Sequence, residues 1–376
     1  MRRWTLSLVM AGLMALALGG GAVRPAEAVF FPPAPVINAK GVVVWQGYDG
    51  NNYQIWRWDP KSQTAQMISQ SNISHDNLAP QINSKGLVVW QGYDGHNYQI
   101  WRWEPKSQTA LSISNNNYYS INPQINDHGV IVWYGNHQIY RWDPKSKTAA
   151  NISQTIYSCA SPPQINAKGL VVWMENDGTH WQIYRWDPKQ PEPANISHSD
   201  YDNEDPMVNG QGVVVWSGGD QFGHYQIYRW DPKTQQAVSI SQSSHNNYYP
   251  QINAQGVVVW YGSDGTYNQI YRWDPKSPTA QMISERDNNY GNWDPEINAK
   301  GVVVWEGSDG TRDPIWLWGP KSPTAQVISP SNCEPYNPSP QINAKGQVVW
   351  TSTDASTNCS VWLYNTKTKQ AGQIWP

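Results

Sequence analysis

The chain has 376 residues, a formal net charge of −3 at neutral pH and only 15% charged residues. Its aromatic residues are 23 Trp and 21 Tyr against 3 Phe. This composition excludes a disordered chain and indicates a β-rich protein with many half-buried aromatic positions. Without residues 1–28 the chain has 23 Lys and Arg against 28 Asp and Glu, a formal charge of −5 that argues against nucleic acid as a partner.

Residues 1–28 have the pattern of a secretory signal peptide. Arg2 and Arg3 precede an apolar run that ends at Leu18, and Ala26 and Ala28 form an A-x-A cleavage signal. The run is too short to span a bilayer, and no later segment is apolar enough for a membrane helix. We therefore expect an exported protein, periplasmic or extracellular, with no membrane span after cleavage. Residues 29–34 are then a short N-terminal segment.

A segment of roughly 43 residues is repeated eight times in the remaining chain. It is typified by P-x-I-N-A-K-G-V-V-V-W-x-G-x-D-G-x-x-x-Q-I-Y-R-W-D-P-K-S-x-T-A-x-x-I-S. Because each unit must bury its apolar face against the next, such a repeat predicts the architecture before any single residue is interpreted. The units start at Pro35, Pro80, Pro123, Pro163, Pro206, Pro250, Pro295 and Pro340.

Each unit carries four short β-strand patterns. In the first unit these are Pro35 to Asn38, Val42 to Trp45, Gln54 to Trp58 and Ala65 to Ser69. Asn-Ala-Lys-Gly, Asp-Gly and Asp-Pro-Lys-Ser sequences between them are typical of tight turns. The second strand is continuously apolar, which indicates burial on both faces. No helical period follows the signal peptide.

A four-stranded unit whose second strand is apolar on both faces needs a similar sheet on each side. A closed ring supplies these neighbours, so we predict one domain over residues 35–376, an all-β eight-bladed β-propeller of four-stranded antiparallel blades. An open solenoid is the alternative, and it would expose Trp-rich faces at both ends. The first unit has its own inner strand and the last its own outer strand, so we expect packing between them to close the ring.

The units resemble the TolB-type β-propeller repeat. The resemblance rests on the Pro that opens the first strand, the turn glycines such as Gly41 and Gly86, the apolar second strand that ends in an aromatic residue, the Asp-Gly hairpin and the Q-I-Y/W strand. It covers residues 35–376 and implies the strand order given above. The family usually has Trp-Ser-Pro-Asp-Gly where this chain has Ile-Asn-Ala-Lys-Gly, and the N-terminal domain of TolB is not matched, so a role in the Tol–Pal system is not implied.

Strand direction predicts two chemically different faces. The turns after first and third strands carry all 15 Lys, whereas the loops after second and fourth strands carry 19 Asp and Glu against two Arg. Aromatic residues also gather in the loops between fourth and first strands. Rings that stack on sugars beside carboxylates and amides that take hydroxyls are typical of glycan binding. The candidate ligand-binding residues are Tyr118, Tyr119, Tyr201, Asp202, Asp205, His245, Tyr248, Tyr249, Tyr290, Trp293 and Asp294.

Motifs for metal or nucleophilic catalysis are missing from the sequence. The His residues lack H-x-x-x-H and H-E-x-x-H spacing, and neither G-x-S-x-G nor a phosphate-binding glycine loop is present. We therefore expect no cofactor and no catalytic residue, with calcium bound between loops as the alternative that stays open.

Three cysteines remain. Cys333 and Cys359 fall on the same predicted face, and export provides an oxidising compartment, so we predict a disulfide between them. Cys159 is left over, either as a free thiol or as an intermolecular partner.

The sequence favours a non-catalytic recognition module that binds a glycan, or a protein of the envelope or extracellular space, through the acidic, aromatic-rich loop face. The alternative is a polysaccharide lyase or hydrolase whose site lies at the propeller axis on the same face. A recognition module could bind several equivalent ligands in equivalent clefts, whereas an enzyme needs one irregular site.

Overall fold

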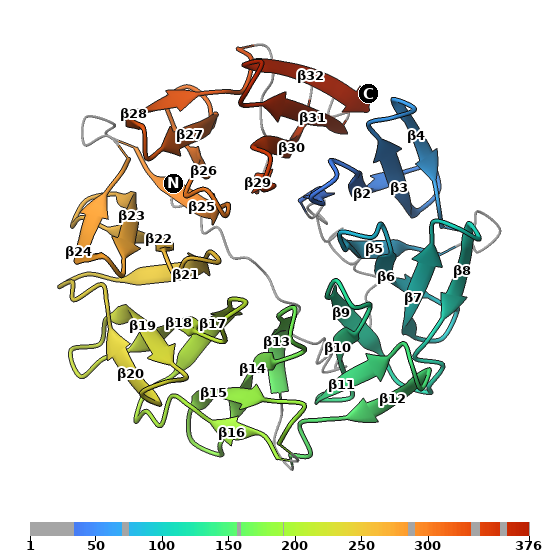
Figure 1. The fold of residues 1–376 in the computed structure, drawn as a ribbon, viewed down its shortest axis with the longest axis horizontal. Helices are drawn as coiled ribbons and strands as arrows, with labels where there is room; N and C mark the ends of the chain where they lie inside the picture. The colour runs from blue at the N-terminus through green and yellow to red at the C-terminus, as the bar shows by residue number, and fades with distance from the viewer. Residues whose placement is uncertain are drawn as a thin grey trace, which may run out of the picture. The chain divides into compact units, whose positions relative to one another are not determined.

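The computed structural model describes residues 34–69, 75–155, 159–190, 192–284, 290–331, 339–353 and 359–375. These residues belong to a compact unit from Pro32 to Pro376 that forms eight four-stranded antiparallel sheets arranged around an axis (Figure 1). The predicted eight-bladed β-propeller is confirmed. The predicted signal peptide lies outside the described residues, within which no helix is long and apolar enough to cross a membrane.

The blades follow the chain, four strands to each. Blades 1 and 2 are β1 (Val36–Ile37), β2 (Val43–Tyr48), β3 (Tyr53–Asp59), β4 (Thr64–Met67), β5 (Asn77–Ile82), β6 (Val88–Tyr93), β7 (Tyr98–Glu104) and β8 (Thr109–Ser112). Blades 3 and 4 are β9 (Ser120–Ile125), β10 (Ile131–Gly135), β11 (Gln138–Asp143), β12 (Thr148–Asn151), β13 (Cys159–Ile165), β14 (Val171–Asn176), β15 (Trp181–Trp186) and β16 (Ala194–Asn195). Blades 5 and 6 are β17 (Asn203–Val208), β18 (Val214–Gly219), β19 (Tyr225–Asp231), β20 (Gln236–Ser239), β21 (Asn247–Ile252), β22 (Val258–Ser263), β23 (Asn268–Asp274) and β24 (Ser277–Met282). Blades 7 and 8 are β25 (Asn292–Ile297), β26 (Val303–Gly307), β27 (Ile315–Gly319), β28 (Ser322–Val327), β29 (Gln341–Ile342), β30 (Gln347–Thr353), β31 (Cys359–Asn365) and β32 (Gln370–Trp375).

The core lies between blades rather than within them. The second strand of every blade contains a Trp that is at most 1% exposed, as the continuous apolar pattern predicts. One core cluster, for example, joins Val44 and Ile55 of blade 1 to Val88 and Trp90 of blade 2. Each blade therefore buries both faces only because it has a neighbour on each side.

A ring of asparagine side chains links the blades on the side of the Asn-x-x-Gly turns. Asn38 Nδ2 donates a hydrogen bond of 3.0 Å to Asn83 O, while Asn38 Oδ1 accepts from the backbone N of Lys40 and of Val42. The same asparagine in each blade is buried and donates to its counterpart in the next blade, and Asn343 of blade 8 donates to Asn38 O at 3.0 Å. The asparagine that looks like an ordinary turn residue in the sequence is thus the circular connection of the propeller.

Six arginines of the third strands connect neighbouring blades further out. The Arg57 guanidinium pairs with Asp59 of its own turn at 2.6 Å and lies 5.6 Å from the ring centre of Trp103 in the next blade. The same arrangement continues through Arg102, Arg141, Arg185, Arg229 and Arg272. Cation–π contacts of half-buried arginines therefore add to the apolar packing between blades.

Blades 7 and 8 carry Leu317 and Leu363 where the other blades carry these arginines. Leu363 packs in one apolar cluster with Trp58 of blade 1, and the Trp375 ring lies 5.9 Å from that of Trp45. The ring is therefore closed by packing between blades 1 and 8, as expected from the sequence, together with the hydrogen bond from Asn343.

The first strands are longer than the sequence predicts in blades 2 to 7. Asp205, Tyr248, Tyr249, Trp293 and Asp294, which we expected in loops, lie in β17, β21 and β25. The sequence pattern was misleading because a β-bulge interrupts each of these strands before its proline, and the pairing register shifts there. The residue at the bulge has a left-handed backbone, with φ of 54° at Asp205 and 49° at Asp294. The prediction that this segment is a loop was therefore wrong.

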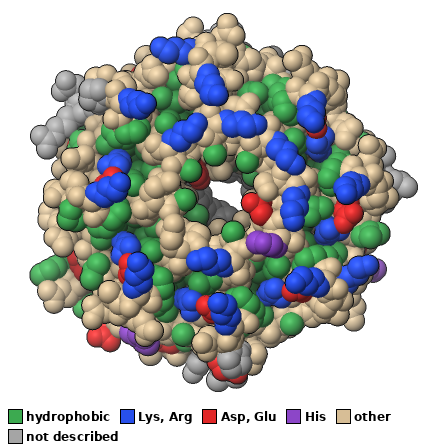
Figure 2. All heavy atoms as spheres, in the orientation of Figure 1, with side chains coloured by type: hydrophobic (Ala, Val, Ile, Leu, Met, Phe, Trp, Pro, Cys, Tyr) green, Lys and Arg blue, Asp and Glu red, His purple; other side chains and the backbone are tan. Residues whose placement is uncertain are grey.

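The two faces of the ring differ in charge as predicted from strand direction. We call the side with the turns after first and third strands the turn face, and the side with the loops after second and fourth strands the loop face. Figure 2 shows the turn face, where Lys and Arg side chains gather over all parts of the ring around an opening on the axis. All 15 Lys are exposed.

Candidate functional site

Many carboxylates of the loop face have structural roles in the hairpins after second strands. Asp49 Oδ1 accepts hydrogen bonds of 2.9 Å from the backbone N of Asn51 and of Asn52, and Asp94, Asp177, Asp264 and Asp309 repeat this arrangement. Asp202, one of the predicted ligand-binding residues, accepts a hydrogen bond of 2.9 Å from Trp181 N in the preceding blade. These carboxylates therefore hold the loops through their Oδ1 atoms.

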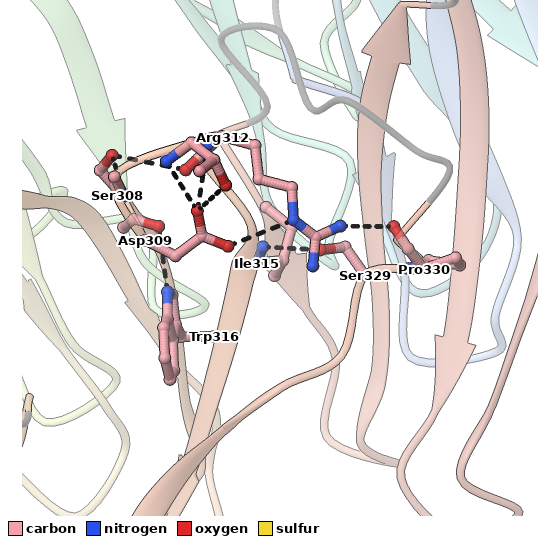
Figure 3. A network of polar contacts seen from close by, with 10 residues as sticks. Ser308, Asp309, Arg312, Ile315, Trp316, Ser329 and Pro330 are labelled. Carbon is pink, nitrogen blue, oxygen red and sulfur yellow. Dashed lines mark hydrogen bonds and ion pairs between the residues drawn. The ribbon is translucent and has the colours of Figure 1, made fainter.

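Arg312 is the loop-face arginine within the described residues, and it is held in place (Figure 3). Its Nε donates to Asp309 Oδ2 at 3.2 Å and its Nη1 to Pro330 O at 3.1 Å. Burial of Asp309 opposes ionisation, yet hydrogen bonds from Thr311 and Arg312 lower the pKa of its carboxyl to about 2. The pair is therefore charged at all ordinary pH values, and the guanidinium is occupied by protein acceptors.

A group of residues on the first three strands of blades 5 to 7 is the candidate site. We call it the axial cluster; it contains the bulge residues Asp205, Tyr249 and Asp294 of the innermost strands, with Tyr225, Tyr248 and Tyr261 between the two acids. Tyr225 donates a hydrogen bond of 2.9 Å to Glu204 and lies 5.1 Å, ring to ring, from Tyr248. The Tyr261 ring lies 5.9 Å from that of Tyr248 and stacks on Tyr249 at 5.5 Å.

The second strand directs the side chain of Tyr261 toward the next blade. At the same strand position in blade 1, Gln46 Oε1 accepts a hydrogen bond from the bulge residue of blade 2, Ala79 N, at 3.0 Å. Tyr261 in blade 6 therefore faces the bulge residue of blade 7, Asp294. Burial raises the pKa of the Tyr261 hydroxyl, and the charges of Tyr249, Asp294 and Asp205 raise it further, so both acids act electrostatically on this hydroxyl.

Two further acids of blade 7 extend the axial cluster. Glu296 accepts a hydrogen bond of 3.0 Å from Gln341 Nε2 of blade 8, and Asp294 Oδ2 accepts one of 3.4 Å from Ser339 Oγ. Glu306 stands at the second-strand position of Gln46 and is paired across the sheet with Trp293. Among the described residues, none donates a hydrogen bond to the carboxyl of Glu306 or of Asp205.

Burial makes these acids weak. It raises the pKa of Asp205 to about 7, with a further contribution from Glu204. It raises the pKa of Glu306 to about 8, helped by Asp294 and Asp313, and that of Glu296 to about 7 against the hydrogen bond from Gln341. Such carboxyls are partly protonated near neutral pH, so each can donate as well as accept a hydrogen bond.

Several predicted residues lie elsewhere on the loop face. Tyr201 and Tyr290 are 41% and 43% exposed, the Tyr290 ring lies against Gly310, and His245 lies against Gly265. Tyr118 and Tyr119 form a separate group in blade 3. The structure thus brings together Asp205, Tyr248, Tyr249 and Asp294 in the axial cluster. Trp293 lies in β25, paired across the sheet with Glu306, and the other predicted residues lie outside the cluster.

The group in blade 3 is aromatic and carries no acid. Tyr119 Oη donates to Tyr134 Oη at 3.3 Å, and Tyr134 Oη lies 3.3 Å from His137 Nδ1. The Tyr118 ring lies 5.7 Å from that of Tyr140. These tyrosines are satisfied by one another, which favours a packing role over ligand binding.

Blade 4 has an exception to the repeat at the site of its buried Trp. In blades 2, 5, 6 and 7 an Asn of the first strand accepts the hydrogen bond of this indole, as Asn203 Oδ1 does from Trp216 Nε1 at 2.9 Å. In blade 4 Cys159 replaces the Asn, and Glu175 replaces the facing glycine and accepts from Trp173 Nε1 at 2.9 Å. Cys159 Sγ lies 3.7 Å from Glu175 Oε2, and burial raises the pKa of both groups. Cys159 is thus a free but buried thiol.

The predicted disulfide is not tested, because Cys333 lies outside the described residues and only the backbone of Cys359, in β31, is described. Within the described residues no group of three or more His, Cys, Asp and Glu is placed to hold a metal ion. A cavity of about 320 Å³ opens on the turn face beside Asn38, Asn83 and Asn126, whose amides are occupied by the asparagine ring.

Sequence reasoning missed Tyr225, Tyr261 and Glu306 because it searched the loops. These residues lie in strands β19, β22 and β26. The usable signal was a departure from the repeat at a fixed strand position: Glu306 where blades 1 and 2 have Gln46 and Gln91.

No family model and no curated protein matches the chain. Solved propellers are similar in structure: dipeptidyl peptidase 4 of Porphyromonas gingivalis has a TM-score of 0.67 at 9% identity, over 91% of this chain and 59% of that one. An oligogalacturonate lyase in complex with manganese has a TM-score of 0.59 at 12% identity, over 89% of this chain and 96% of that one. A protein assigned to TolB from Agrobacterium tumefaciens reaches only 0.43 over 60% of this chain, too little to support the TolB-type resemblance. The chain spans about 59% of the peptidase. At these identities the likeness shows the β-propeller fold alone.

Proposed function

We propose that the protein is a recognition module that binds one glycan at the axial cluster of its loop face. The observation that carries the proposal is the convergence of Asp205, Tyr248, Tyr261 and Asp294 from three consecutive blades. Tyrosine faces stack on the apolar faces of sugars, and carboxyls that both donate and accept hydrogen bonds suit sugar hydroxyls. The irregularity of the cluster favours a single site over several equivalent clefts.

The charge of the site favours a glycan without acidic groups. Asp205, Asp294, Glu296 and Glu306 face the ligand position, and Arg312, the described arginine of this face, is occupied by Asp309 and Pro330. A polyuronate, the substrate class named for the similar oligogalacturonate lyases, would meet carboxyls that are still partly ionised near neutral pH, and no unpaired loop-face cation stands among the described residues to offset them. A neutral oligosaccharide is therefore the ligand class that we propose.

Calorimetric titration with a panel of neutral oligosaccharides tests the proposal. We expect a stoichiometry of one, a loss of affinity of about tenfold or more in Tyr248→Ala and Asp294→Asn, and normal affinity in the matched control Tyr290→Ala, an exposed tyrosine outside the cluster. A stoichiometry above one, or an equal loss in the control, would contradict the axial site. Absence of binding to any neutral glycan would contradict the ligand class and move the proposal to a protein partner.

The raised pKa values favour one second candidate, a glycosidase that acts on a neutral polysaccharide. Glycoside hydrolysis uses one protonated and one ionised carboxyl, and Asp205, with a pKa of about 7 beside Glu204, offers such a pair. Release of reducing ends by the wild type but not by Asp205→Asn would establish it. If binding occurs without turnover, the protein is a recognition module. Export to the periplasm or the extracellular space remains a proposal that rests on residues 1–28.

A further inference from the structure

The lysines of the turn face are exposed and form no ion pair among the described residues. All 15 are exposed, and within the described residues none is within ion-pair distance of a carboxylate. Six acids of this face are already paired with the third-strand arginines, at distances such as 2.8 Å between Arg185 and Asp187. The arginines thus neutralise the nearby acids and leave the ammonium groups of the described lysines without a carboxylate partner; one of them, Lys345, donates to Lys40 O at 3.3 Å.

The positive charge covers the turn face in two dimensions. Lys40, Lys85, Lys168, Lys300 and Lys345 stand on the inner turns, and the other lysines on the outer turns of all eight blades. Figure 2 shows the blue side chains distributed over the whole ring rather than along one line. A linear polyanion could cover only a row of them, whereas a flat anionic surface could meet all of them together.

Within the described residues the turn face exposes no large apolar side chain. The exposed large apolar residues among the described part of the chain lie in loop-face loops or in fourth strands; they are Tyr48, Leu111, Tyr201, Phe222, Val238, Tyr267, Tyr290 and Val327. The turn face therefore offers neither a wedge for the bilayer interior nor an aromatic platform for unstacked bases. Its chemistry fits attraction to charged headgroups at the surface of a membrane.

We propose that the turn face docks on a bilayer of anionic lipids, so that the loop face points away from the membrane. The carboxylates of the loop face would oppose the reverse orientation, and the residues after the signal peptide carry a net negative charge that would otherwise repel the protein from such a surface. Docking would present the axial cluster to ligands in solution. This proposal does not depend on the glycan ligand proposed above.

Vesicle co-sedimentation tests it, with phosphatidylcholine vesicles and with vesicles that contain about one third phosphatidylglycerol. We expect the protein to bind the anionic vesicles better than the neutral ones, and the difference to disappear at about 0.5 M salt, where exposed charges are screened. The test variant replaces five outer lysines by Gln, at Lys61, Lys106, Lys189, Lys233 and Lys276, and we expect it to lose about tenfold or more of the binding.

A control variant with the same change in net charge separates orientation from overall charge. It places Glu on five exposed loop-face positions: Asn51, Asn117, Gln221, Ser244 and Thr266. We expect its binding to be within about twofold of wild type, because these side chains would face away from the bilayer. Equal losses in the two variants, or no preference of the wild type for anionic vesicles, would overturn the proposal.

A third arm distinguishes lipid from other phosphate sources. Soluble polyphosphate should compete weakly with vesicles of equal phosphate concentration, because it cannot contact inner and outer turns of all blades at once. If polyphosphate binds with the same lysine dependence while anionic vesicles do not, the bilayer assignment is wrong.

Discussion

The turn face and the loop face belong to the same eight repeats, yet they differ in how strictly the repeat is kept. On the turn side Asn38 and its seven counterparts make the same hydrogen bonds in every blade, and the last one closes the circle. On the loop side the equivalent positions hold Gln46, Tyr261 or Glu306. The difference teaches that side-chain hydrogen bonds on one side hold the ring, which leaves the other side free to vary in charge and shape.

We expect the largest loss of stability when the asparagine ring of the turn face is broken. Asn209→Ala would remove the acceptor of Gln211 N, Gly212 N and Val213 N and the donor to Asn253 O, and all of these bonds except the one from Gln211 are buried. We expect the free energy of unfolding to fall by about 3 kcal/mol, since buried backbone groups left without partners cost about 1–3 kcal/mol each. Denaturant unfolding measures this effect.

The matched loop-face change is Asp49→Ala, which removes two hydrogen bonds to exposed backbone groups. It should cost about 1 kcal/mol, because water can replace the lost acceptor. Equal costs for the two variants would mean that the asparagine ring is no more important than an ordinary hairpin.

The acids of the axial cluster should make stability depend on pH. The pKa values of Asp205, Glu296 and Glu306 in the folded protein, about 7, 7 and 8, lie above the ordinary values of 3.8 and 4.5. The folded state therefore holds protons more tightly, and the free energy of unfolding should decrease as pH rises from about 4 through 8. The variant Asp205→Asn/Glu296→Gln/Glu306→Gln should be more stable than wild type at high pH by about 2 kcal/mol, and indistinguishable near pH 4.

Thermal unfolding of the wild type and this triple variant across that pH range provides the measurement. Parallel curves would show that the carboxyls titrate at ordinary values, and would remove the electrostatic support for the second candidate function. Asp231 on the turn face should affect stability in the opposite direction. A hydrogen bond from Lys233 N and the pairing with Arg229 lower the pKa of its carboxyl, although burial opposes them. Its contribution to the free energy of unfolding is therefore lost only as pH falls into the acidic range.

The exception in blade 4 can be tested by restoring the repeat. Cys159→Asn alone should crowd Glu175, because in blade 2 Asn77 Oδ1 comes within 2.6 Å of where a Cβ on Gly92 would stand. Glu175→Gly alone would leave Trp173 Nε1 without its acceptor. We expect each single variant to lose about 2 kcal/mol and the double variant to lose less than about 1 kcal/mol, a coupling of about 3 kcal/mol. Additive losses in this double-mutant cycle would mean that the two exceptions are unrelated.

The repeat predicted the eight blades, and local patterns of a few residues predicted the turns, most of the strands and the charge of the turn face; the early starts of the first strands in blades 2 to 7 were not predicted. The sequence did not predict the asparagine ring: Asn38 has the local chemistry of a turn, and its bond to Asn83 exists only once two blades are adjacent. The axial cluster was predicted in part, through Asp205, Tyr248 and Asp294. Tyr261 and Glu306 were missed, since the importance of a second-strand residue depends on which bulge of the next blade it faces.

The smallest predicted effect concerns the lysines that make the turn face positive. Lys106 is exposed and has no ion pair among the described residues, so Lys106→Gln should change the free energy of unfolding by less than about 0.5 kcal/mol. Denaturant unfolding should therefore give the same midpoint and slope as wild type. A clearly destabilised variant would mean that the lysines stabilise the fold, and no binding partner would be needed to explain why they recur in every blade. An unchanged stability would instead mean that 15 lysines are kept on one face without contributing to the fold, which is the condition that docking on an anionic surface requires.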